Sequence, residues 1–120
     1  MARVNGATLL ARDPKPVVVD TSFDLADTDA GEKRFRASHV PGSHYLHLDR
    51  DLSGAKNGKN GRHPLPNRAD FARTVTALGI GPETAVVALD GQGGVYAARL
   101  WWMLRWLGHR SVAVLDGGLS

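Results

Sequence analysis

The fold is decided by residues 86–108, whose sequence is VVALDGQGGVYAARLWWMLRWLG. Val86–Leu89 is a short, continuous apolar run, which is typical of a strand buried on both faces of a sheet. From Tyr96 onward, apolar residues recur at three- and four-residue spacing, which predicts a helix. Further apolar residues, including Trp102, cover the remaining face, so we expect this helix to be mostly buried. Gly108 is the expected left-handed stop of the helix.

A loop with three glycines in five positions joins the predicted strand and helix: Asp90, Gly91, Gln92, Gly93 and Gly94. The backbone N–H groups of such a loop, together with a helix N-terminus, form a cradle that binds anions. The loop lacks the lysine and the glycine spacing of the known phosphate- and dinucleotide-binding motifs, so it can equally be a tight turn that allows close packing. Asp90, at its first position, is expected to cap this turn with a side-chain oxygen.

The composition is that of one soluble globular domain, residues 1–120. Apolar residues make up 42% of the chain, and no run approaches the length of a membrane span or of a signal peptide's hydrophobic region, so a cytoplasmic location is expected. A formal net charge of +3 is too small to indicate a nucleic-acid partner, although it favours small anions. The sequence contains no cysteine, which excludes disulfides, thiolate metal sites and a cysteine nucleophile within these residues. No cofactor is expected.

The rest of the chain alternates between strand-like and helix-like segments. The predicted strands are residues 17–19, 45–48 and 112–115, and the predicted helices are residues 6–12, 30–38 and 68–78, the last capped by Asn67 and ended by Gly79. Residues 23–29 and 50–66 are predicted loops, and residues 39–42 a turn. This order predicts an α/β fold with a mainly parallel, buried sheet and helices on both faces. The chain stops directly after a strand, so we expect it to be truncated.

Sites in such sheets lie at the carboxyl ends of the strands. Four aspartates occupy these predicted ends: Asp20, Asp49, Asp90 and Asp116.

Three segments stand out, in this order: His39-Val40-Pro41-Gly42, Arg99-Leu100-Trp101-Trp102-Met103-Leu104 and Val114-Leu115-Asp116-Gly117-Gly118. Together they resemble the rhodanese-like domains, and more narrowly the amino-terminal domain of tandem thiosulfate and 3-mercaptopyruvate sulfurtransferases. The resemblance implies that the loop of residues 90–94 corresponds to the one whose first residue, in catalytic domains, is the cysteine that carries sulfane sulfur as a persulfide. Here that position holds Asp90, and a carboxylate cannot carry a persulfide. The resemblance therefore implies a retained scaffold, with the active cysteine in a second, carboxy-terminal rhodanese domain beyond Ser120.

The same resemblance implies a supporting catalytic role for two residues. His63 would assist proton transfer or substrate orientation beside the partner domain's cysteine, and Asp49, expected at the end of the third strand, would orient His63. An imidazole held by a carboxylate suits such work. The alternatives are that His63 is merely solvated in its loop, and that the neighbours Arg50 and Asp51 change which group pairs with Asp49.

The favoured hypothesis is therefore one domain of an enzyme that moves sulfur from 3-mercaptopyruvate or thiosulfate to a thiophilic acceptor such as cyanide or a thiol. By itself the chain is expected to be inactive. The alternative is a stand-alone inactive module that binds or regulates a partner. A phosphatase-like use of the loop is disfavoured by the missing cysteine and by Asp90. No metal site is expected, because His44, His47 and His63 show no ligand motif.

Overall fold

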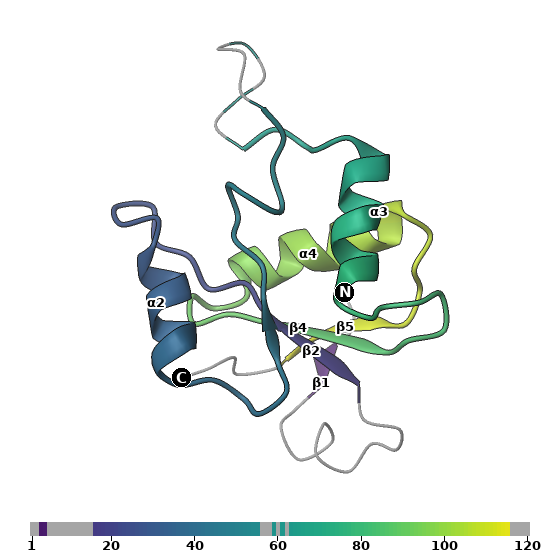
Figure 1. Cartoon of the computed structure of the whole chain (residues 1–120), viewed down its shortest axis with the longest axis horizontal. Helices are drawn as coiled ribbons and strands as arrows, with labels where there is room; N and C mark the ends of the chain where they lie inside the picture. The colour runs from purple at the N-terminus through teal and green to yellow at the C-terminus, as the bar shows by residue number, and fades with distance from the viewer. Residues whose placement is uncertain (1–2, 5–15, 56–58, 60, 62, 116–120) are drawn as a thin grey trace.

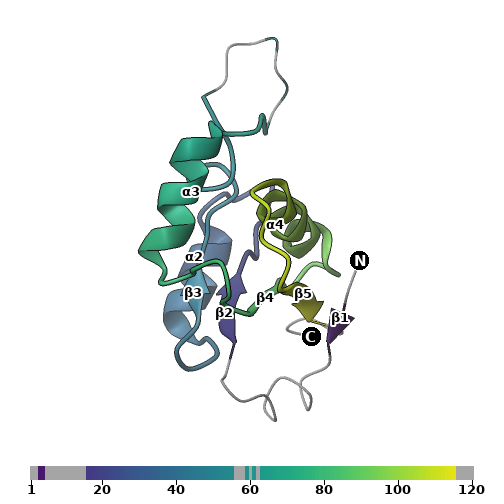
Figure 2. The ribbon, with the colours of Figure 1, turned by 90° about the vertical axis from the view of Figure 1, so that its right-hand side faces the viewer.

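The computed structural model describes residues 3–4, 16–55, 59, 61 and 63–115. A five-stranded sheet forms its centre, and every pair of neighbouring strands is parallel. Across the sheet the strands are β1 (Arg3–Val4), β5 (Val112–Leu115), β4 (Val86–Leu89), β2 (Val17–Asp20) and β3 (His44–Tyr45). The described helices are α2 (Ala30–Ala37), α3 (Arg68–Ala77) and α4 (Val95–Trp106). Figure 2 shows the strands side by side in this order, which confirms the predicted α/β class.

The register of the two inner strands places the ends of β2 and β4 level with each other. Val17 of β2 lies opposite Val86 of β4, and Asp20 lies opposite Leu89. The segments that follow these strands therefore leave the same edge of the sheet together. Thr21 continues the pairing, because its backbone N–H donates to the carbonyl of Leu89 at 2.8 Å.

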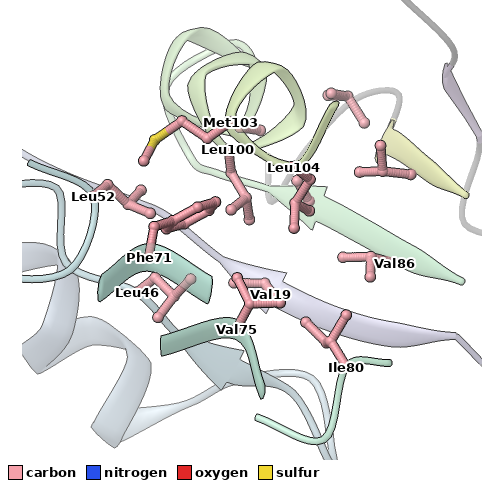
Figure 3. Close-up of a cluster of buried hydrophobic side chains, with 14 of the residues drawn as sticks. Val19, Leu46, Leu52, Phe71, Val75, Ile80, Val86, Leu100, Met103 and Leu104 are labelled. Carbon is pink, nitrogen blue, oxygen red and sulfur yellow. The ribbon is translucent and has the colours of Figure 1, made fainter. Parts of the chain in front are cut away.

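The main core lies between the sheet and the helices α3 and α4, which cover the same face (Figures 1 and 3). It is built from Val19 and Val86 of the strands, Phe71 of α3, and Leu100 and Leu104 of α4, among others. Side chains alternate across a strand, so the neighbours on β2 and β4 face the other way, and these are buried too. The prediction of a sheet buried on both faces is confirmed.

The predicted helix ends are also confirmed. The side chain of Asn67 accepts the backbone N–H of Ala69 at 2.8 Å and caps α3. Gly79 and Gly108 follow α3 and α4 with φ of +83° and +91°, a conformation that disfavours any other residue. The part of the chain that the structure describes has no helix long and apolar enough to cross a membrane.

Most of α4 is buried or half-buried, as expected, but Trp102 is an exception. The side chain of Trp102 is 48% exposed and stacks on Trp106, with ring centroids 6.0 Å apart. The guanidinium groups of Arg68 and Arg105 lie over the rings of Trp106 and Trp101. Trp102 thus lies on the outer face of α4, whereas Trp101 and Trp106 are half-buried and pack against the core. The apolar pattern alone does not distinguish these positions.

Two further expectations about the strands need correction. Strand β1 was not predicted at all, and its two residues pair only with β5 at the sheet edge. The third strand is shorter than predicted and ends at Tyr45, since the chain turns at residues 47–51, where Asp51 N–H donates to the carbonyl of His47 at 2.8 Å. Asp49 therefore lies in a turn and not at a strand end. The predicted helix 6–12 and Asp116 fall outside the described residues.

Candidate functional site

The carboxylate of Asp90 fills the cradle formed by its own loop. Its side chain is buried, and Oδ1 accepts the backbone N–H groups of Gln92 and Gly94 at 2.9 and 2.8 Å. Oδ2 accepts those of Tyr96 and Ala97, both at 2.9 Å, in the first turn of α4. The expected capping role of Asp90 is thus present in its geometry. The chain's own anion occupies the place where such loops bind an external one.

Glycines allow the loop to fold around this carboxylate. Gly93 and Gly94 have φ of +77° and +97°, so two consecutive residues adopt the left-handed conformation. Gly94 is the N-cap of α4 and brings no capping side chain, so Asp90 takes over that task from four residues away. The sequence Gly93-Gly94 is therefore required by the turn and is not by itself evidence of a ligand.

The loop is also tied to the segment that follows β2. The backbone N–H of Gly91 donates to Ser22 Oγ at 2.9 Å, and the N–H of Phe23 donates to Gln92 Oε1 at 3.2 Å. The hydroxyl of Tyr45 donates to the carbonyl of Ser22 at 2.7 Å, and burial raises the pKa of Tyr45 to about 12, so the hydroxyl stays protonated as a donor. These bonds make the edge of the sheet around Asp90 a closed, well-connected unit.

The structure brings together the side chains of Asp49 and His63, the second pair of residues expected at the site. His63 Nδ1 lies 3.0 Å from Asp49 Oδ1, and their side chains are 22% and 30% exposed. Because an ionised carboxylate only accepts hydrogen bonds, Nδ1 carries the ring hydrogen and donates a hydrogen bond to Asp49. The other ring nitrogen, Nε2, is buried and has no hydrogen-bond partner among the described residues.

The turn at residues 47–51 explains why Asp49 is free to pair with His63. His47 Nδ1 accepts the backbone N–H groups of Asp49 and Arg50 at 3.1 and 3.2 Å and fixes the turn. Arg50 points elsewhere and pairs with Glu32 of α2 at 2.7 Å, while Asp51 accepts the backbone N–H of His47. Both neighbours that could have changed the partner of Asp49 are thus engaged with other groups.

Sequence reasoning missed two residues that connect these groups. Phe23, expected in a loop, is buried and packs edge-on against the rings of His63 and Tyr96, with centroids 6.1 and 5.5 Å away. Arg99 of α4 donates to the carbonyls of Leu52 and His63 at 2.8 and 3.0 Å. The signals for them were an aromatic residue just after a buried strand, and an arginine that stands in the mainly apolar helix and in the second of the three segments quoted for the resemblance. Over the described residues, no group of three or more histidine, aspartate or glutamate side chains is arranged to hold a metal ion.

Comparison with known protein families and sequences identifies the family of this chain. The model of the rhodanese-like domain matches residues 7–120, and the chain belongs to this family. The chain is 43% identical over 110 residues to a probable 3-mercaptopyruvate sulfurtransferase of Pseudomonas aeruginosa, an alignment that covers 90% of this chain and 39% of that protein. It is 39% identical over 105 residues to a thiosulfate sulfurtransferase of Cricetulus griseus, covering 84% of this chain and 34% of that protein.

The solved structures agree with the sequence relatives. A 3-mercaptopyruvate sulfurtransferase from Leishmania major superposes with a TM-score of 0.89 at 29% identity, over 98% of this chain and 32% of that one. One from Escherichia coli superposes with a TM-score of 0.82 at 27% identity, over 97% and 45%. The chain thus spans less than half the length of each of these relatives.

Proposed function

We propose that this chain is the amino-terminal, cysteine-free domain of a two-domain sulfurtransferase that takes sulfur from 3-mercaptopyruvate or thiosulfate. A carboxy-terminal rhodanese-like domain supplies the cysteine, and residues 1–120 supply His63 and Asp49 to a composite site between the domains. The proposal is supported by the two sulfurtransferases named above, because the alignments cover only 39% and 34% of the length of those proteins.

In the proposed reaction, His63 delivers the proton that the product needs. The cysteine thiolate attacks the sulfur of 3-mercaptopyruvate, a sulfur–sulfur bond forms, and the carbon–sulfur bond breaks. The electron pair of that bond stays on the carbon as the enolate of pyruvate, which takes up one proton. The products are a cysteine persulfide and pyruvate. Imidazole is the side chain best suited to deliver that proton near neutral pH, directly or through one water.

The observation that carries this proposal is the state of the two nitrogens of His63. Nδ1 is fixed by Asp49 at 3.0 Å, which leaves Nε2 as the nitrogen that can exchange a proton, and Nε2 is buried without a partner among the described residues. An unsatisfied buried nitrogen costs about 1–3 kcal/mol, so a purely structural histidine would be expected to satisfy it. Nε2 is covered in this chain, so the proposal requires that docking of the second domain exposes it to the substrate.

The loop of Asp90 takes no part in sulfur transfer under this proposal. Asp90 already accepts four backbone N–H groups, so a donor anion would have to displace it from a buried position. The domain then acts as a rigid support for the pair of Asp49 and His63.

The test is a steady-state sulfurtransferase assay with 3-mercaptopyruvate and with thiosulfate, using cyanide as acceptor. It compares the 120-residue chain, the product of the full reading frame, and that product with His63→Ala or Asp49→Asn. His39→Ala is the matched control, because His39 is exposed and its Nδ1 lies 2.6 Å from the backbone carbonyl of Phe35, within its own turn.

We expect activity in the longer product only, a loss of about 100-fold in kcat with His63→Ala, a smaller loss with Asp49→Asn, and no change with His39→Ala. A reading frame without a second rhodanese-like domain, or an equally active His63→Ala enzyme, would contradict the proposal. Either result would favour the alternative of an inactive binding module.

A further inference from the structure

We propose that Arg99 is a positioning residue that sets the pair of Asp49 and His63 by closing the loop between them. Its side chain leaves α4 and reaches both ends of that loop. Nε and one terminal nitrogen donate to the carbonyl of Leu52 at 3.2 and 2.8 Å, and the same terminal nitrogen donates to the carbonyl of His63 at 3.0 Å. The role in catalysis rests on the proposed function, whereas the role in geometry belongs to this chain alone.

The loop that carries His63 is irregular where the structure describes it. The described residues between Leu52 and Pro66 form no helix or strand. Between described residues of the loop, the backbone N–H of Gly54 also donates to the carbonyl of Pro64 at 2.8 Å. Gly54 fits closely there, since a Cβ atom would lie 2.7 Å from the carbonyl oxygen of Leu65. Arg99 thus bonds directly to the backbone of the residue whose side chain must meet Asp49.

The energetics of Arg99 do not resemble those of a residue that serves stability. Burial lowers the pKa of Arg99, and no ion pair links it to a carboxylate of the described part of the chain. A cation removed from water and compensated only by carbonyls gives little net stability. What the guanidinium provides is several donors in a fixed plane, able to hold two carbonyls at once.

A lysine cannot reproduce this arrangement. Its ammonium is a point charge on a flexible stem, so it can reach one end of the loop but cannot hold both in a fixed geometry. We therefore expect Arg99→Lys to keep the charge and lose most of the positioning, while Arg99→Met removes both and keeps the packing of the stem. Arg105→Met is the matched control on the same helix, because Arg105 is exposed and lies over Trp101, away from the loop.

The test measures the tautomer of His63 and the order of the loop in the 120-residue chain, without any assay of activity. Long-range ¹H–¹⁵N spectra report which ring nitrogen carries the proton, and amide exchange of Gly54 reports loop opening. We expect a single Nδ1–H tautomer in wild type and in Arg105→Met. Arg99→Met gives a tautomer mixture and exchange of Gly54 at least about tenfold faster, with Arg99→Lys between these limits.

The amides of Tyr96 and Ala97 lie in the same helix as Arg99 and donate to Asp90. They distinguish local opening of the loop from unfolding of the domain, because they stay protected from exchange if the domain is intact. If Arg99→Met is too unstable to study, Arg99→Lys decides the matter alone. A folded Arg99→Lys protein with one Nδ1–H tautomer and wild-type exchange at Gly54 would overturn the proposal.

The same variants in the two-domain protein separate this proposal from the proposed function. We expect Arg99→Met to lower kcat about 10- to 100-fold with little change in KM, and to have no further effect when His63→Ala is already present. If His63→Ala leaves activity intact, the proposed function fails, and the tautomer measurement still decides the role of Arg99. A kcat loss of equal size in both backgrounds would show that Arg99 does not act through His63.

Discussion

Replacing Asp90 by asparagine tests the claim that a buried carboxylate holds the loop and the start of α4. Two backbone N–H groups donate to each oxygen, from Gln92 and Gly94 to Oδ1 and from Tyr96 and Ala97 to Oδ2. An asparagine keeps one oxygen and places an NH₂ group at the other, so two buried donors face a group that cannot accept.

The magnitude follows from those four bonds. Each buried N–H left without an acceptor costs about 1–3 kcal/mol, and the two remaining bonds lose their charge assistance. Removing a buried charge recovers part of this, which leaves an expected loss of about 3 kcal/mol in the free energy of unfolding. That is a large share of the total stability of an ordinary domain.

The assay is urea unfolding of the 120-residue chain followed by tryptophan fluorescence, with linear extrapolation to water. Asp24→Asn is the control, since Asp24 also accepts two backbone N–H groups, from Ala26 and Asp27, but in an exposed turn. We expect that control to lose less than about 1 kcal/mol. If Asp90→Asn is as stable as Asp24→Asn to within 1 kcal/mol, the reasoning about the filled cradle is refuted.

Three further predictions concern backbone strain, pH and packing. Gly93→Ala is expected to lower the free energy of unfolding, measured in urea, by about 1 kcal/mol, because φ is +77° at this position. The control, Gly81→Ala, lies at an ordinary φ and should change it by less than about 0.5 kcal/mol. Equal losses in the two variants would contradict this prediction. The hydrogen bond from Arg50 lowers the pKa of Glu32 below 4.5, so the pair stabilises the folded state above that pH and the contribution is lost as pH falls below it. The Tm difference between wild type and Arg50→Met should therefore shrink between about pH 6 and pH 3, and a difference independent of pH would refute the assignment. Phe71→Ala empties a fully buried position and should cost about 3–5 kcal/mol by urea unfolding; a loss below 1 kcal/mol would show that the core closes around the gap.

The parts of the fold that the sequence predicted are those determined by local pattern. The apolar run at Val86–Leu89 and the glycines at positions 79 and 108 act through burial and backbone conformation, which are properties of a few adjacent residues. Strand β1 escaped prediction because two residues carry too little pattern, and only their pairing with β5 makes them a strand. The exposure of Trp102 depends on what packs around α4, which the helix itself does not encode.

The candidate site divides in the same way. The pairing of Asp49 with His63 was expected from a resemblance, and the geometry brings the two side chains together, although their catalytic role stays a proposal. Asp49 was wrongly expected at a strand end, because the capture of its N–H by His47 ends the extended chain earlier. The contacts of Arg99 span 47 positions in the sequence to Leu52 and 36 to His63, so no local pattern could reveal them.

The most direct measurement of the central claim uses the full-length protein and the cysteine of its proposed second domain. It is the single-turnover rate at which that cysteine gains sulfur from 3-mercaptopyruvate, followed by intact mass. We predict that His63→Ala slows this step about 100-fold and that the 120-residue chain alone gains no sulfur. An unchanged rate in the folded His63→Ala protein would contradict the account.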